Sequence, residues 1–258
     1  MPPIRKGDGT PVTPKGISQI RTGDGRILFD GVAIPDSGAD HQWNYTTGSG
    51  TTVEDTIADL DLSYTSISDW PTDAGAGGTY AKLDETDDAD VGDDKFTHFF
   101  ENKEGTYLLW AFIDSGWSDG GKPTRSPWGT GRTSTNTNIG FEWRDDEYAA
   151  ALTIDGNFND VSGGTVSDHE GEWVASALVA DGSNWRLYLA TPGDYNVSEL
   201  GSTSISGSDS GTWSQNLLFG ADSNNVFEGG TDIQFVDSDA WTESEIQSFV
   251  NDSKEFYE

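Results

Sequence analysis

The stretch that decides the fold runs from Trp173 to Ala190 and reads WVASALVADGSNWRLYLA. Two short runs of aromatic and aliphatic residues flank the turn signal Asp181-Gly182. The second run alternates as a strand does, with Trp185, Leu187 and Leu189 on one face and more polar neighbours between them. The pattern predicts two antiparallel strands joined by a tight turn.

The same pattern recurs outward along most of the chain. From about Asp40, short aromatic and β-branched runs alternate with clusters of Gly, Ser, Asp and Asn, which is typical of many strands joined by tight loops. The clearest further runs are residues 106–113, 138–143, 148–154, 217–219 and 232–236. Only the end is predicted to be helical, because Thr242 and Glu245 form a capping box that precedes apolar residues at helical spacing. The Gly/Ser-rich stretch 201–211 is predicted to be a loop.

Charge is the most unusual property of the composition. The 258 residues include 45 acidic and 14 basic side chains, which gives a formal net charge of −31. In molar salt the Debye length falls to about 3 Å, so neighbouring carboxylates repel one another weakly while they still hold water. Because the acids are spread along the chain, we interpret them as an adaptation to brine. The same charge repels phosphate and disfavours a nucleic-acid partner.

Aromatic residues and the absence of cysteine set further bounds. Ten Trp, eight Tyr and twelve Phe provide enough large side chains for a hydrophobic core, and the length fits one main β-sandwich domain. A chain without cysteine has no disulfide, no thiolate metal site and no thiol nucleophile. No stretch approaches the ~18 apolar residues of a membrane span, and the first residues contain no apolar secretion signal, so we expect no membrane insertion.

The N-terminal segment differs from the rest in charge. Residues 1–26 contain only two acids, Asp8 and Asp24. We predict that residues 1–39 attach the protein to an acidic partner, since opposite charge favours docking; the alternative is an unattached basic terminus. The residues expected to make this attachment are Arg5, Lys6, Lys15, Arg21 and Arg26.

Residues 40–258 resemble the laminin-G-like, concanavalin A-like jelly-roll domains. The resemblance rests on four landmarks in order: an opening that begins His41-Gln42-Trp43, a long central strand 107–112, the 173–189 hairpin, and a close that runs from 218 to 246. It implies an all-β antiparallel β-sandwich with one short C-terminal helix and an extended N-terminal segment, and it says little about function. Residues 1–39, together with the acidic composition, are similar to attachment segments in head or tail proteins of haloarchaeal tailed viruses.

The stretch from Ser115 to Arg132 is basic and aromatic in an otherwise acidic chain, and its Gly, Pro and Ser content predicts a loop. Trp rings can stack on sugars, while Lys and Arg bond hydroxyls or carboxylates of an anionic glycan. Alternatively, the Trp rings cover the edge of the sandwich and the bases pair with the chain's own acids or with a neighbouring subunit. The candidate ligand-binding residues are Trp117, Lys122, Arg125, Trp128 and Arg132.

A metal site is also considered. The run 84–90 is predicted to be a loop rich in carboxylates, which are the oxygen ligands that Ca²⁺ or another salt cation prefers. In a brine protein such a run also serves simply as a solvated surface. The candidate ligands are Asp84, Asp87, Asp88 and Asp90.

Catalysis is tested against the geometry of glycosidases, which use two carboxyls about 5 Å apart when they retain configuration and about 6.5 to 9.5 Å apart when they invert it. Glu142 and Asp146 would share a strand face at a separation of about 13 Å, which is too long. The pair Asp145 and Glu147 is closer but has no other support in so acidic a chain. We therefore expect no enzyme activity, and structural roles for His41, His98 and His169, whose spacing matches no zinc or acid-base motif.

These observations together predict a non-enzymatic virion structural protein of a halophilic virus. It would stand on the head or tail as a decoration, spike, turret or fibre, in the extracellular high-salt environment. Residues 1–39 would contact other virion proteins, the sandwich would adhere to a host-surface glycan or glycoprotein, and the assembly would be a homo-oligomer, a trimer or a pentamer. The alternatives are a secreted or cell-surface carbohydrate-binding module of a halophilic archaeon and a glycan hydrolase.

Overall fold

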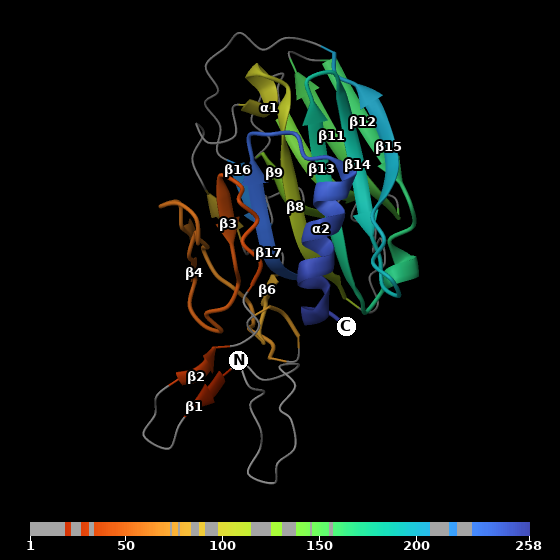
Figure 1. Cartoon of the computed structure of the whole chain (residues 1–258). Helices are drawn as coiled ribbons and strands as arrows, with labels where there is room; N and C mark the ends of the chain where they lie inside the picture. The colour runs from red at the N-terminus through yellow and green to blue at the C-terminus, as the bar shows by residue number, and fades with distance from the viewer. Residues whose placement is uncertain are drawn as a thin grey trace.

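The protein is an antiparallel β-sandwich, as the sequence predicted (Figure 1). Its structure is a computed structural model of the 258-residue chain. The described residues are 19–21, 27–30, 34–72, 74–76, 78–83, 88–90, 98–114, 125–130, 138–144, 146–154, 157–206, 217–220 and 229–258.

One large sheet has seven strands. In spatial order they are β15 (Ser198–Ser204), β14 (Asn184–Ala190), β13 (Trp173–Asp181), β8 (Glu104–Ile113), β17 (Gly229–Asp237) and β3 (His41–Trp43), and β6 (Ala81–Leu83) also pairs with β17. The hairpin predicted from 173–190 is therefore β13 and β14, which pair from Ala175↔Ala190 to Ala180↔Trp185.

The other large sheet has six strands. In order they are β12 (Asn157–Gly163), β11 (Glu147–Ile154), β10 (Asn138–Arg144), β9 (Arg125–Thr130), β16 (Leu217–Gly220) and β7 (Asp88–Asp90). Two small sheets pair β4 (Thr52–Val53) with β5 (Leu62–Ser63) and β1 (Gln19–Arg21) with β2 (Ile27–Asp30).

Helices are few in the described part of the chain. They are α1 (His98–Glu101), α2 (Glu243–Ser253) and two 3₁₀ turns, η1 (Ser167–His169) and η2 (Lys254–Phe256). Among the residues described, no helix is both long enough and apolar enough to cross a membrane. The predicted capping box is confirmed at α2: the backbone N–H of Glu245 donates to the Thr242 side chain, and the Glu245 carboxylate accepts from the backbone N–H of Thr242.

The main core lies between the two large sheets. Alternate residues of the strands whose side chains are described point inward, so that one set of large aromatic side chains fills the interior. Among the largest of these fully buried rings are Trp43, Trp143 and Trp185, together with Tyr45, Tyr107 and Tyr148.

A polar chain also crosses this interior. The Gln234 amide donates to the Tyr45 hydroxyl at 2.8 Å and accepts from the Tyr107 hydroxyl at 2.8 Å, and Tyr45 lies 2.6 Å from the Tyr64 hydroxyl. Each of these buried groups therefore has a partner, which removes most of the cost of taking it out of water.

A second apolar layer lies on the outer face of the seven-stranded sheet. Helix α2 lies across this face in front of β8 and β13 (Figure 1), and Ile246, Phe249 and Val250 are its buried apolar residues. The sheet meets them with Trp110 and Phe235, among others. The helix thus seals one face of the sandwich.

The loop prediction for residues 201–211 is wrong in part. Residues 201–204 belong to strand β15, which pairs with β14. β15 is an edge strand whose composition of Ser, Thr and Gly reads as a loop, but pairing to the apolar β14 holds it in the sheet. Residues 207–211 lie outside the described part of the chain.

Candidate functional site

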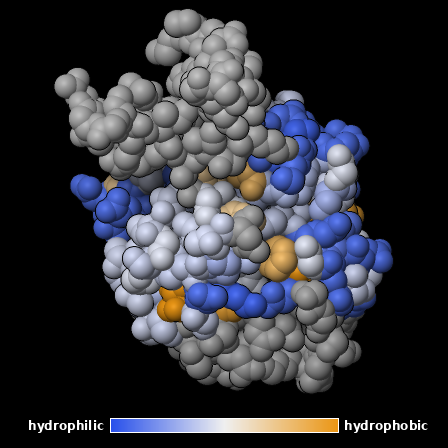
Figure 2. Space-filling view, turned by 90° about the horizontal axis from the view of Figure 1, so that it is seen from below, coloured by the Kyte–Doolittle hydropathy of each residue, from blue (hydrophilic) through white to orange (hydrophobic). Residues whose placement is uncertain are grey.

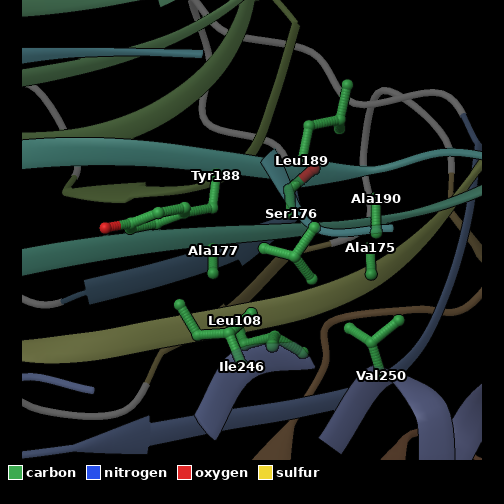
Figure 3. Close-up of a pocket in the computed structure, with 10 residues that line it drawn as sticks. Leu108, Ala175, Ser176, Ala177, Tyr188, Leu189, Ala190, Ile246 and Val250 are labelled. Atoms are coloured by element: carbon green, nitrogen blue, oxygen red, sulfur yellow. The ribbon is translucent and has the colours of Figure 1, made fainter. Parts of the chain in front are cut away.

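The two outer faces of the sandwich differ in what they offer a ligand. On the seven-stranded side, α2 packs on the sheet and leaves only a narrow gap, with no space for a water molecule, between the helix and β13 (Figure 3). Ala175 and Ala177 of β13 form part of its wall, and Ile246 and Val250 of α2 face them. Ser176 and Tyr188 also line the gap, but it is too narrow to hold a ligand, so it is a feature of the packing between helix and sheet.

The outer face of the six-stranded sheet carries a compact set of charged side chains. On β10, Phe141 and Trp143 are buried in the core, so Glu142 and Arg144 point to the opposite face. Asp160 lies on β12, two strands away, with β11 between them. We call Glu142, Arg144 and Asp160 the Arg144 cluster.

The guanidinium of Arg144 joins the two carboxylates. Nη2 bonds the Asp160 carboxylate, and Nη1 lies 3.6 Å from Oε2 of Glu142. To reach Asp160, the Arg144 side chain crosses β11, whose Ala149 is completely buried. The three charged side chains are 27%, 13% and 31% exposed for Arg144, Glu142 and Asp160, so the cluster is held in place yet open to solvent.

The chemistry of the Arg144 cluster suits hydroxyl groups. The two carboxylates are acceptors and the guanidinium is a donor. A sugar diol both donates and accepts, so it complements such a mixed set. With two negative charges and one positive charge, the cluster repels an anionic ligand more than a neutral one.

The carboxylates considered for catalysis have structural partners. Asp146 accepts from the backbone N–H of Ser167 at 2.8 Å and from its hydroxyl at 2.7 Å, in a turn where Asp146 has φ +66°. Glu142 lies beside Arg144, as described above. Glu147 accepts from the Ser162 hydroxyl, and Asp145 lies outside the described residues.

The structure revises the predicted ligand-binding loop. Trp117, Lys122 and Arg132 lie outside the described residues, but Arg125 and Trp128 belong to β9, a strand inside the six-stranded sheet. The loop prediction is therefore wrong for residues 125–130. Composition misled because the strand contains Pro, Gly and Ser, although it pairs with β10 on one side and β16 on the other.

The register explains how β9 tolerates its proline. Trp128 is opposite Phe141 and Arg125 is opposite Trp143, so β9 has one residue more than β10 in this interval. The extra residue makes a bulge around Ser126 and Pro127, and a bulge is where a strand can lose a ladder hydrogen bond.

The predicted cation site at residues 84–90 stays a prediction, because only part of it is described. Asp84 and Asp87 lie outside the described residues, whereas Asp88 and Asp90 form the ends of β7 and pair with Gly220 and Leu218 of β16. The loop prediction is thus wrong for 88–90, because pairing to β16 extends the chain there. Within the described ranges, no three His, Asp or Glu side chains are grouped as a metal site.

Most of the predicted attachment residues lie outside the residues that the structure describes. Arg5, Lys6, Lys15 and Arg26 are not described, and Arg21 is the last residue of β1, opposite Ile27 of β2. The two strands form a ribbon below the sandwich in Figure 1 and pair with no other described strand. The attaching role of residues 1–39 and the domain boundary at 39/40 stay predictions.

The histidines have local partners. Nδ1 of His41 is 2.7 Å from Oδ2 of Asp55. Burial alone would raise the pKa of Asp55, but the bonds from His41 and from the backbone N–H groups of Ile57, Ala58 and Gln42 hold it below its ordinary value.

The other two histidines are likewise packed into the fold. Burial lowers the pKa of His98 despite the nearby carboxylates of Asp40 and Asp237. His169 lies 3.5 Å from a Glu172 oxygen. These contacts give all three histidines a structural setting.

A second arginine has the same kind of environment on the other sheet. Nε of Arg186 donates to Asp181 at 3.1 Å, and Nη1 donates to Glu199 at 2.9 Å. Asp181 also accepts from the backbone N–H groups of Ser183 and Asn184, so it closes the β13–β14 turn. We use Arg186 below as a matched control for Arg144.

Sequence reasoning missed the Arg144 cluster, although part of the signal was present. The alternation in Phe141-Glu142-Trp143-Arg144 places both charged residues on one face of a strand. Asp160 could not be added, because residues 157–163 were not predicted as a strand.

Searches of known proteins gave structural matches only. No protein-family model matches the chain, and no curated protein sequence matches it. The binding domain of Paraclostridial Mosquitocidal Protein 1 has a TM-score of 0.61 at 13% identity and covers 83% of this chain and 52% of its own. The botulinum neurotoxin serotype D binding domain has a TM-score of 0.59 at 11% identity, with coverages of 83% and 51%.

A third match is of similar size to this chain. It is domain 4 of AbnA, a GH43 extracellular arabinanase from Geobacillus stearothermophilus, in complex with arabinotriose, with a TM-score of 0.58, 12% identity and coverages of 82% and 97%. The chain spans about half the length of the two toxin domains. At these identities the matches establish the β-sandwich fold.

Proposed function

We propose that this protein is a non-catalytic recognition module that binds a glycan on the outer face of its six-stranded sheet. The observation that carries the proposal is the Arg144 cluster, a fixed set of donors and acceptors that stays open to solvent on one face while α2 seals the other. The solved structures of similar fold, two toxin binding domains and an arabinanase domain with a bound trisaccharide, support a binding role.

The Arg144 cluster favours neutral glycans over the anionic glycans expected from the 115–132 stretch. Its net charge of one negative unit comes from Glu142 and Asp160 against Arg144. An incoming carboxylate or sulfate would compete with these two carboxylates for one guanidinium, whereas a diol would add hydrogen bonds to all three groups.

A glycan array in molar salt, followed by calorimetric titration of the best neutral ligand, tests the proposal. Arabinotriose is the first probe because the arabinanase domain of similar fold holds it. Arg144→Ala should weaken binding by about 10- to 100-fold, the effect of removing a charged hydrogen-bond donor. Arg186→Ala, which removes an arginine clamped in the same way on the other sheet, should leave the affinity unchanged.

Two outcomes would contradict the glycan site. One is equal loss of affinity in both arginine variants, which would point to a general electrostatic effect. The other is a ligand whose binding survives Arg144→Ala, which would move the site elsewhere on the protein.

We further propose that the module works on the surface of a halophilic virus particle, attached through residues 1–39. The net charge of −31 supports the saline setting. The β1–β2 ribbon supports attachment, because a ribbon of two strands is marginally stable alone and gains stability against another surface. Reversing the basic charges of residues 1–26 should reduce incorporation into particles and leave glycan affinity unchanged; particles that incorporate the variant normally would refute the attachment.

A further inference from the structure

Asp232 is a carboxyl group placed where three separate parts of the chain meet. It lies in β17 between Thr231, which is opposite Ala111 of β8, and Gln234, which is opposite Leu109. β17 therefore has one residue more than β8 in this interval, and such a bulge redirects a side chain. The Asp232 residue is completely buried.

The carboxylate ties two distant segments to β17. Oδ2 of Asp232 accepts from the backbone N–H of Ala76 at 2.5 Å and from the hydroxyl of Tyr257 at 3.0 Å. Tyr257 follows η2 next to the C-terminus, and its ring stacks on Trp110 with centroids 4.1 Å apart. Asp232 is thus the polar anchor of a C-terminal segment that aromatic packing otherwise holds.

The same carboxyl is poorly solvated when it is charged. Burial raises the pKa of Asp232 to about 7, and the bonds from the Ala76 N–H, the Tyr257 hydroxyl and the Tyr45 N–H offset only part of this effect. The titratable groups that face it are Tyr257 and Tyr45, and burial raises the pKa of both phenols well above the ordinary value. The described residues of the 74–76 turn contribute only backbone groups. Asp232 is therefore the group here that changes charge near neutrality.

The sign of the coupling follows from the direction of this shift. A carboxyl whose pKa is raised by folding binds its proton more tightly in the closed state than in the open state. Opening of the segment is therefore least favourable at acid pH. It becomes easier as the pH rises from about 4, the ordinary value, to about 7, and it changes little above that.

We propose that Asp232 is a proton-dependent latch that holds residues 254–258 and the 74–76 turn against β17 when protonated and favours their release when ionised. Release admits water to the carboxylate and uncovers part of the apolar face that includes Trp110. The latch is independent of the glycan site, since it lies on the seven-stranded sheet.

Hydrogen exchange at the C-terminus tests the latch directly. The backbone N–H of Tyr257 donates to the carbonyl of Lys254 at 2.9 Å and reports closure. After correction for intrinsic exchange, the opening constant for residues 254–258 in the full-length protein should rise about tenfold per pH unit between pH 4 and 7, roughly a thousandfold in all. Peptides from β13 should show no such change, which separates local release from global unfolding.

Three variants complete the experiment. Asp232→Asn keeps the size of the side chain and cannot ionise, so its opening constant should be independent of pH. Tyr257→Phe should open more at every pH, because it keeps the ring stack and loses the donated bond. Tyr195→Phe is the matched control, since Tyr195 also packs on Trp110, with centroids 5.3 Å apart, and its hydroxyl donates to the carbonyl of Trp173 at 3.4 Å and not to Asp232; its opening constant should keep the wild-type pH profile. The latch is refuted if Asp232→Asn keeps the wild-type pH profile, or if Tyr257→Phe opens no more readily than Tyr195→Phe.

Discussion

Replacing Phe249 by alanine tests the claim that α2 belongs to the folding core and not to a movable cover. Phe249 is 5% exposed. Its ring packs edge-on against Phe235, with ring centroids 5.0 Å apart, and against Trp241, with ring centroids 6.3 Å apart. Truncation removes a buried ring and leaves a cavity, a change that costs about 3 to 5 kcal/mol of unfolding free energy. In a domain of this size, where 1 kcal/mol shifts Tm by about 2 °C, that corresponds to a fall in Tm of roughly 6 to 10 °C.

The measurement is urea denaturation of the wild type and of Phe249→Ala in molar salt, monitored by tryptophan fluorescence. Glycan affinity is measured in parallel. We expect a lower midpoint at an unchanged slope and an unchanged affinity, because the variant site and the Arg144 cluster lie on opposite faces of the sandwich. A loss of less than about 1 kcal/mol would refute the reasoning, since it would mean that the helix contributes little to the core. A lower slope would show that the helix unfolds separately from the sheets.

Three further changes have defined outcomes. Thr242→Ala removes the side chain that caps α2 and should cost about 1 kcal/mol in the same urea experiment, whereas Thr242→Ser should be nearly neutral. Gly105→Ala should cost about 2 to 4 kcal/mol, because Gly105 has φ +148° and an added Cβ would lie 2.7 Å from the His98 ring; a Tm within 2 °C of wild type would contradict this. Ala177→Val adds two methyl groups at a buried position between β13 and α2 (Figure 3), where no space is left for them, and should cost about 1 to 3 kcal/mol; an unchanged urea midpoint would show that the helix shifts to make room.

Most of the fold could be predicted from local sequence patterns. The β13–β14 hairpin was predictable because its apolar residues alternate around an Asp-Gly turn, and α2 because its capping box stands directly before an apolar stripe. Each of these signals spans only a few neighbouring residues. Each element buries the face on which its apolar residues lie.

Strands that depend on their neighbours were not predictable. β9 contains Pro127, and residues 201–204 of β15 are Gly, Ser, Thr and Ser, so both stretches have the composition of a loop. What makes them strands is pairing with partners distant in sequence, such as β9 with β16. A single sequence does not show which strands become neighbours.

The same limit applied to the candidate site. Glu142 and Arg144 could be placed on one strand face from alternation alone, but their partner Asp160 comes from another strand and joins them only through the sheet. The predicted site at 115–132 was instead inferred from composition, which marks residue types and not their positions.

Among the described residues visible from below, hydrophobic side chains do not gather in one large area. Figure 2 shows hydrophilic residues across much of the described surface there, with hydrophobic ones in separate spots. Ile57 is the exposed large hydrophobic side chain among the residues described.

The carboxylates that close turns give the fold an unusual tolerance. Asp55 accepts from three backbone N–H groups and Asp181 from two, and these bonds, with their side-chain partners, hold the pKa of each carboxyl below its ordinary value. Electrolyte weakens attraction between charges separated by water, but it does not enter a contact between a carboxylate and an amide. These turns should therefore keep their conformation both in saturated brine and in mildly acidic media. Under the same conditions, a turn held by ion pairs alone would lose most of that stabilisation.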